Sequence, residues 1–253
     1  MTINNKLRGF REIWQFDNRW YLIFSRIFFP GQSVQLYRLN GVEFLNDQQA
    51  GDANGAREVI TTPMYRRYFS QMDLSGEINV LDLGSNNGGF PLLLKAAGHE
   101  IKTLACVELN PKTFSRLCFN LELNFRSNFT ALNYGVCGDN REISIRLGDG
   151  STGDNIYCSN GGATETALRI SGRTFDDVFD EVYRDQIVDL CKIDIEGAEF
   201  EVFEGNHANR IAQCKYLLME IHHAADRPRN RVLARLFAAG FEEIGGEANI
   251  RMT

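Results

Sequence analysis

The residues best suited to chemistry follow the ends of predicted strands. The stretch VLDLGSNNGGF, residues 80–90, is an apolar strand that carries Asp82 into a turn of glycine and asparagine. Gly84 and Gly89 match two glycines of a dinucleotide-binding turn, but Asn86 stands where the middle glycine would admit a diphosphate. A carboxylate beside that turn also repels phosphate. The turn therefore favours a cationic nucleoside such as S-adenosylmethionine, whose amino end Asp82 can hold.

The next two predicted strands end in residues that suit the rest of a nucleoside. Glu108 ends the second strand, where an acid can accept hydrogen bonds from both ribose hydroxyls. NAD enzymes use the same arrangement, so Glu108 does not choose between the cofactors, and a solvated acid is the simpler alternative. Gly135 and Val136 follow the third strand, where an adenine ring would lie, although an ordinary turn explains them equally well.

Charged residues also gather after the fourth and fifth predicted strands. The stretch KIDIEGAE, residues 192–199, holds four charges in eight positions. Asp194 and Glu196 share a strand face, from which Asp194 can orient or deprotonate a hydroxyl. Glu199 opens the following helix, where the helix dipole gives it a structural role. His222, in MEIHH, can accept a proton at neutral pH, with a structural hydrogen bond to the main chain as the alternative. Two carboxylates are a thin basis for a divalent metal site, so no metal is predicted.

The elements between these residues alternate in the manner of an α/β protein. Short apolar runs that end in glycine or an acid predict strands, and each is followed by a helical pattern. Such repeats form a parallel sheet with helices on both faces, and ligands bind beyond the carboxyl ends of its strands. The predicted strands are 78–84, 102–110, 129–137, 187–197 and 214–223, with 241–246 and 248–253 able to close the sheet. The predicted helices are 89–98, 111–124, 174–183, 198–206 and 230–240, and 141–160 resembles a hairpin or loop insert.

Residues 1–75 are predicted to form an N-terminal extension to a cofactor-binding domain of residues 76–253. The stretch SVQLYRLNGVEFLN predicts a hairpin that turns at Asn40 and Gly41. The stretch WYLIFSRIFFP, residues 20–30, is too short to span a bilayer and contains Arg26. It predicts a helix packed on the domain, with an amphipathic contact to a membrane surface as the alternative.

Composition narrows the class of protein. The chain has 253 residues, 43% of them hydrophobic, and a net charge of −6, which argues against a nucleic-acid partner. Its six cysteines form no CxxC pair, so we expect reduced thiols in a cytoplasmic protein rather than a zinc site. The start of the chain shows no signal-peptide pattern. Nothing in the sequence fixes an oligomeric state.

Taken together, these stretches resemble the FkbM-like family of S-adenosylmethionine-dependent methyltransferases. The resemblance covers residues 56–223 and is carried by EVITTPMYRRYF, VLDLGSNNGGF, VELNP, RTFDDVF, CKIDIEGAEFEVFEG and LLMEIHH. It implies a Rossmann-like class I methyltransferase fold, with a mostly parallel seven-stranded sheet, helices on both faces and an N-terminal helical extension. It also implies methyl transfer to oxygen, often of a sugar or glycan. Asn87 departs from the family pattern, which has an apolar residue at this position.

We expect direct displacement at the sulfonium methyl, with much of the rate supplied by positioning. The acceptor is expected to be a small molecule or a glycan, and His222 or Asp194 to take the hydroxyl proton. The predicted catalytic residues are Asp194, Glu196 and His222, and the predicted cofactor-binding residues are Asp82, Gly84, Ser85, Asn86, Gly88, Glu108, Leu109 and Val136. Two alternatives are a nicotinamide-dependent oxidoreductase and a non-catalytic nucleoside-binding module.

Overall fold

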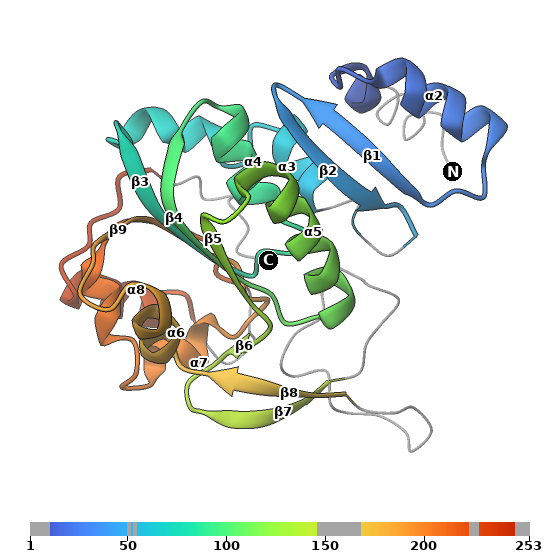
Figure 1. Cartoon of the computed structure of the whole chain (residues 1–253). Helices are drawn as coiled ribbons and strands as arrows, with labels where there is room; N and C mark the ends of the chain where they lie inside the picture. Colours follow the sequence, from blue (N-terminus) through green and yellow to red (C-terminus); the bar gives the residue numbers. More distant parts are fainter. Residues whose placement is uncertain (1–10, 50–51, 53–54, 146–167, 223–227, 246–253) are drawn as a thin grey trace.

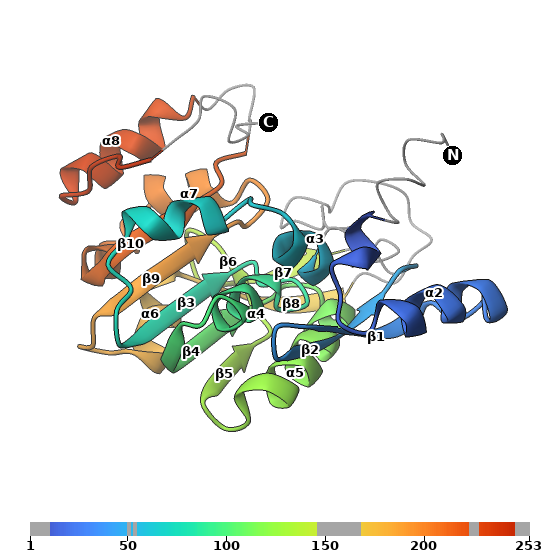
Figure 2. The same cartoon turned by 90° about the horizontal axis from the view of Figure 1, so that it is seen from above.

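The computed structural model describes residues 11–49, 52, 55–145, 168–222 and 228–245. Its centre is a five-stranded parallel sheet in the order β10-β9-β3-β4-β5; Figure 1 labels β9, β3, β4 and β5, and Figure 2 labels β10 as well. β3 and β9 are neighbours, so the winding of the chain reverses between them, which is where ligands bind in Rossmann-like sheets. The strands are β3 (Glu77–Leu83), β4 (Glu100–Val107), β5 (Phe129–Leu132), β9 (Val188–Ile193) and β10 (Cys214–Met219).

Alternate residues of the strands face two separate apolar cores. Val80, Leu104 and Leu190 face the core that includes α3, α4 and α5. Leu81 and Cys191 face the core that includes α6, α7 and α8. These helices are α3 (Ala56–Thr61), α4 (Gly89–Ala96), α5 (Pro111–Phe125), α6 (Phe175–Val182), α7 (Glu199–Glu204) and α8 (Asn230–Ala238), and Figure 2 shows them around the sheet. The predicted helices are confirmed, and the charged residues after Val80 and Leu190 fall on the α4 side.

Local sequence explains the ends of these helices. Asn110 caps α5, since its side chain accepts hydrogen bonds from the backbone N–H groups of Lys112 and Thr113, and Pro111 follows at the first helical position. Thr174 caps α6 by accepting a hydrogen bond from the N–H of Asp177. These caps fix where each helix leaves the strand end, and so where the intervening loops lie.

The hairpin of the N-terminal extension packs against α5, α4 and α3. The predicted hairpin is confirmed as β1 (Val34–Leu39) and β2 (Val42–Asp47), and Asn40 and Gly41 both have positive φ as its tight turn requires. Two side-chain amides of α5 form hydrogen bonds with the free edge of β2. Asn120 bonds the backbone N–H and C=O of Leu45, and Asn124 bonds the backbone N–H and C=O of Glu43. The remaining elements are α2 (Arg19–Phe28) and two 3₁₀ helices, η2 (Arg66–Gln71) and η3 (Asn209–Gln213).

The predicted third strand is broken in two. β5 pairs with β4, whereas β6 (Gly135–Val136) belongs to a second sheet of order β6-β8-β7. Asn133 lies at the break, and its side-chain amide donates hydrogen bonds to the backbone carbonyls of Glu108 and Leu109, in place of a strand ladder. The predicted insert begins with β7 (Arg141–Ile145), which forms a strand. Its antiparallel partner is β8 (Leu168–Arg173), which lies beyond the predicted insert. Residues 146–160 of the predicted insert lie outside the described residues.

The prediction of seven strands in one sheet is not confirmed, because the described residues give five. Residues 241–245 form no strand: the chain leaves α8 through Gly240 at φ +95°, Phe241 packs on the second core, and the next four residues are exposed rather than alternately buried. The other predicted closing strand, 248–253, lies outside the described residues. Within the described part of the chain, no helix has the length and apolarity needed to cross a membrane, and the five described cysteines are free thiols.

Candidate functional site

A cavity of about 290 Å³ lies at the carboxyl ends of the central strands. Its walls come from the turn after β3, the ends of β4 and β9, the β6 strand and the α3 side of the extension. Of the residues predicted from sequence, its lining includes Gly84, Ser85, Asn86, Glu108, Leu109, Val136, Asp194 and Glu196. Three predicted residues lie outside this lining: Asp82, Gly88 and His222. Asp82 contacts the lining residue Lys192, and His222 contacts the lining residues Asp194 and Glu196.

The glycines of the turn are required by the protein itself. Gly84 has φ +78°, and a Cβ built there would lie 1.7 Å from the carbonyl oxygen of Asp194. Gly88 has φ +93° at the start of α4, where a Cβ would lie 3.2 Å from Leu117. Asn86 also has positive φ and points its backbone N–H at Glu108. Glycine is therefore needed at position 84 for the close approach to the end of β9, and at position 88 for its backbone conformation beside α5, whether or not a ligand approaches the turn.

Asn87 explains the departure from the family pattern. It is fully buried, and its side-chain oxygen accepts a hydrogen bond of 2.6 Å from the N–H of Ala56, at the first residue of α3. Its backbone carbonyl accepts another from the amide of Asn120. Asn87 thus ties the cofactor turn to the extension and to α5, and its side chain faces protein rather than the cavity.

Glu108 is held at the cavity wall by two backbone donors. One carboxylate oxygen accepts the N–H of Asn86 at 2.9 Å, and the other accepts the N–H of Asn110 at 2.8 Å. Burial raises the pKa of this carboxyl group to about 7, against the lowering effect of the two donors. A group with this pKa gains from additional hydrogen-bond donors, such as a pair of hydroxyls, because donors stabilise the ionised form.

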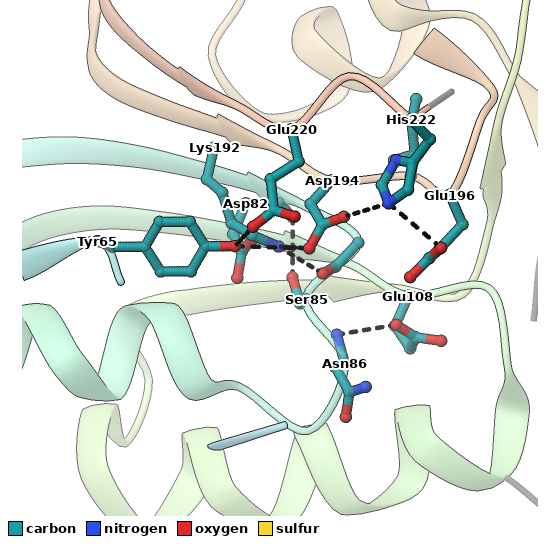
Figure 3. Close-up of polar contacts among 12 residues, drawn as sticks. Tyr65, Asp82, Ser85, Asn86, Glu108, Lys192, Asp194, Glu196, Glu220 and His222 are labelled. Carbon is teal, nitrogen blue, oxygen red and sulfur yellow. Dashed lines mark hydrogen bonds and ion pairs between the residues drawn. The ribbon is translucent and has the colours of Figure 1, made fainter. Parts of the chain in front are cut away.

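Asp82 and Lys192 form a buried ion pair beneath the cavity (Figure 3). They are direct neighbours on β3 and β9, and the ammonium lies 3.3 Å from Asp82 and 3.6 Å from Asp194. The same ammonium donates a 2.7 Å hydrogen bond to the carbonyl of Gly84. Burial raises the pKa of Asp82, which Lys192 opposes. Burial lowers the pKa of Lys192, but the surrounding carboxylates outweigh it and hold that pKa above its ordinary value.

His222 is surrounded by carboxylates. Its Nδ1 lies 3.0 Å from Glu199, which is fully buried, and its Nε2 lies 3.3 Å from Glu196 and 3.7 Å from Asp194. Burial lowers the pKa of His222, but these three carboxylates outweigh it and raise the pKa to about 9. With a pKa of about 9, the ring carries a proton on both nitrogens at neutral pH, and Nδ1 donates to Glu199.

Tyr65 completes the polar network from the far side of the cavity. Its hydroxyl donates a 2.9 Å hydrogen bond to Glu220 and lies 3.5 Å from Asp194, while its ring packs edge-on against Phe90. Burial and the two carboxylates raise the pKa of Tyr65 well above its usual range, so it stays a donor. Reasoning from strand ends missed Tyr65, because it lies between α3 and η2. Its only sequence signal was the stretch EVITTPMYRRYF.

The cavity is strongly acidic. Its described lining contains the carboxylates of Glu58, Glu108, Asp194, Glu196 and Glu220, and only one ammonium, that of Lys192. Asp194, Glu220 and His222 also bring one ligand atom each to within 4.8 Å of one another. A protonated His222 offers no lone pair to a metal, so an ion would have to displace that proton. The absence of a metal stays a prediction.

Comparison with known proteins places the chain in a family. The model of the methyltransferase FkbM domain matches residues 82–243, which is more than half of the chain. No curated protein matches the sequence significantly.

Several solved structures are similar to parts of the chain at low sequence identity. They include an FkbM methyltransferase from Methylobacillus flagellatus KT (18% identity, TM-score 0.38, 65% of this chain and 43% of that one). They also include Trm5 of Methanocaldococcus jannaschii in complex with adenosine (16%, 0.31, 40% and 29%) and the N-terminal domain of human METTL16 (14%, 0.43, 87% and 85%). The chain thus spans less than half the length of the first two. On the family match, the chain belongs to the FkbM methyltransferase family.

Proposed function

We propose that the chain is an S-adenosylmethionine-dependent O-methyltransferase that acts on a hydroxyl of a sugar, glycan or glycolipid. The observation that carries the proposal is the excess of acidic side chains in the cavity lining, five to one ammonium, which persists at four to one when Glu108, with a pKa of about 7, is protonated. A site of this charge attracts a sulfonium and an ammonium and repels a diphosphate. It therefore argues against a nicotinamide cofactor and against a polyanionic acceptor such as RNA.

The residues present fit this cofactor. Glu108, Leu109 and Val136 line the cavity, so that the Glu108 carboxylate would accept hydrogen bonds from the two ribose hydroxyls and the other two would offer apolar surface to an adenine ring. Asp82 supports the site through Lys192 rather than by reaching the cavity, since its side chain is fully buried. The cofactor, when bound, supplies a methyl group activated by the adjacent sulfonium.

Asp194 is the group best placed to receive the acceptor proton. It lines the cavity and its Oδ1 is buried without a hydrogen-bond donor among the described residues. His222 is already protonated, so it cannot take the proton first. His222 instead pairs through Nε2 with Asp194 and Glu196 and so helps to position both carboxylates. Tyr65, whose proton is donated to Glu220, and the Glu220 carboxylate then offer acceptor oxygens to the neighbouring hydroxyls of a polyol.

Binding and transfer can be tested separately. S-adenosylhomocysteine and NADH are titrated by calorimetry into the wild type, Glu108→Gln and Asp194→Asn, with the exposed Asp185→Asn as a matched control. Wild type, Asp194→Asn and Asp185→Asn should bind S-adenosylhomocysteine alike, and Glu108→Gln should bind roughly tenfold or more weakly, because two charge-assisted hydrogen bonds lose strength. NADH should not bind. Binding of NADH without S-adenosylhomocysteine would overturn the proposal.

Transfer is measured with a radiolabelled methyl donor and three acceptor panels: free sugars, glycolipids and RNA. A sugar or glycolipid should be labelled, and Asp194→Asn should lower that rate by about 10²–10⁴-fold while keeping cofactor affinity. Labelling confined to RNA would refute the acceptor class. An unchanged rate in Asp194→Asn would refute the assignment of the base.

A further inference from the structure

An aromatic patch on α2 faces away from the protein. We define the aromatic patch as Trp20, Tyr21, Phe24, Ile27, Phe28 and Phe29, whose exposed fractions run from 48% to 65%. Phe24 and Phe28 stack with ring centroids 6.0 Å apart. Contiguous apolar surface of this kind on a soluble domain marks an interaction site.

The inner face of α2 is fixed by polar contacts, so the helix cannot turn its aromatic side inwards. Ser25 accepts a hydrogen bond from the amide of Gln35, and Arg26 donates one to the hydroxyl of Tyr37. Leu22, on the same inner face, is fully buried. The outward direction of the patch is therefore built into the docking of α2 on the hairpin.

We propose that the aromatic patch binds the surface of an anionic phospholipid bilayer. α2 carries Arg19 and Arg26 and no acidic residue, whereas the whole chain has a net charge of −6. A short helix with large aromatic side chains outward suits the headgroup region, where Trp and Tyr are favoured, and Arg19, which lies over the ring of Trp14 beside Trp20, adds a positive charge next to them. This inference goes beyond the proposed function and does not depend on it.

Size argues for a lipid surface over a second copy of the chain. A stable protein–protein interface needs about 20–30 residues on each side, and the aromatic patch has six. A bilayer, by contrast, can take up single side chains one at a time. Figure 2 shows α2 on the side of the molecule towards which the strands of the parallel sheet point, which is also the side of the cavity. Contact there would bring the cavity near the lipid headgroups.

Vesicle sedimentation of the full chain tests the proposal without any activity measurement. The vesicles are phosphatidylcholine with or without phosphatidylglycerol. The test variant is Phe24→Ser/Phe28→Ser, and the matched control is Phe119→Ser/Leu123→Ser, two exposed apolar residues of α5. The wild type and the control should bind vesicles that contain phosphatidylglycerol, and the test variant should bind roughly tenfold more weakly or worse. Arg19→Gln should reduce the preference for the anionic lipid.

Each other outcome overturns the proposal. Equal binding by the test variant would place the contact elsewhere. No binding by the wild type, with self-association in light scattering that the test variant loses, would identify a second copy as the occupant. No binding together with a large drop in the melting temperature of the test variant would mean that the patch is covered by this chain itself. We expect both variants to keep the melting temperature of the wild type, because the substituted side chains are exposed.

Discussion

Removal of the Lys192 ammonium should lower the stability of the fold, because this group pairs with the buried Asp82 beneath the cavity. Lys192→Met leaves Asp82, which is fully buried, without the cation 3.3 Å away. Breaking a buried ion pair from one side costs about 3–5 kcal/mol, because the remaining charge is desolvated and uncompensated. The hydrogen bond from Lys192 to the Gly84 carbonyl is lost as well, which adds about 1 kcal/mol. In a domain of this size, where 1 kcal/mol shifts the melting temperature by about 2–4 °C, the melting temperature should fall by about 8–24 °C.

A second substitution should recover the stability that Lys192→Met loses through the unpaired charge of Asp82. It should not recover the stability lost with the hydrogen bond to Gly84. Asp82→Asn in the Lys192→Met background removes the unpaired carboxylate and should restore at least about 2 kcal/mol. Without Lys192, the pKa of Asp82 rises further, since burial is then opposed only by the hydrogen bond with Ser85. A carboxyl group with a raised folded-state pKa stabilises the fold below its unfolded pKa and loses this contribution as pH rises. The deficit of Lys192→Met should therefore shrink as pH falls.

Urea unfolding followed by circular dichroism measures these differences at neutral pH. Lys215→Met is the control, because Lys215 forms an exposed ion pair with Asp189 and its removal should change the unfolding midpoint little. A loss under about 1 kcal/mol for Lys192→Met, or no recovery on adding Asp82→Asn, would refute the buried pair. The Asp82→Asn single variant adds a second reading. Loss of S-adenosylhomocysteine binding without loss of stability would mean that Asp82 contacts the ligand directly.

Three further predictions concern the walls of the cavity. Affinity for S-adenosylhomocysteine, measured by calorimetry, should rise as pH increases through about 7, because the ionised Glu108 is the better acceptor, and Glu108→Gln should flatten this dependence. Gly84→Ala should cost more than about 4 kcal/mol or prevent folding, whereas Gly98→Ala, also at positive φ but with nothing within 4 Å, should cost about 1 kcal/mol by thermal unfolding. Glu199→Gln should lower the pKa of His222 from about 9 in an NMR titration, since it removes the carboxylate at 3.0 Å. The stability that this raised pKa supplies is complete below pH 6.5 and is lost as pH rises through about 9, so Glu199→Gln should also flatten stability across that window; an unchanged titration would mean that Glu196 and Asp194 suffice.

Residues at strand ends could be predicted from sequence because parallel strands share one carboxyl edge. Glu108 and Asp194 are far apart in the chain, yet both line one cavity, as the strand order requires. Lys192 could have been found by the same reasoning, since a charge inside an apolar strand needs a partner and Asp82 is in the adjacent strand. Tyr65 could not, because its place depends on how a 3₁₀ segment of the extension packs on α4.

The break in the predicted third strand shows a different limit. The run from Phe129 to Cys137 is suitable for one strand in composition, and no local residue type forbids it. Its second half pairs instead with β8, whose residues lie more than thirty positions later and were not predicted as a strand. Long-range pairing decides such cases, since a short strand gains more from its neighbours than from its own propensity.

The role of His222 changes most between sequence and structure. From sequence, a histidine at a strand end has an ordinary pKa of 6.5 and is a natural base. Three carboxylates around it turn it into a cation, and that cation in turn offsets part of the repulsion between Asp194 and Glu196. Under the proposed function, His222 therefore acts by holding the acidic side chains around it together rather than by taking the proton itself. That role is a property of the cluster rather than of any single residue.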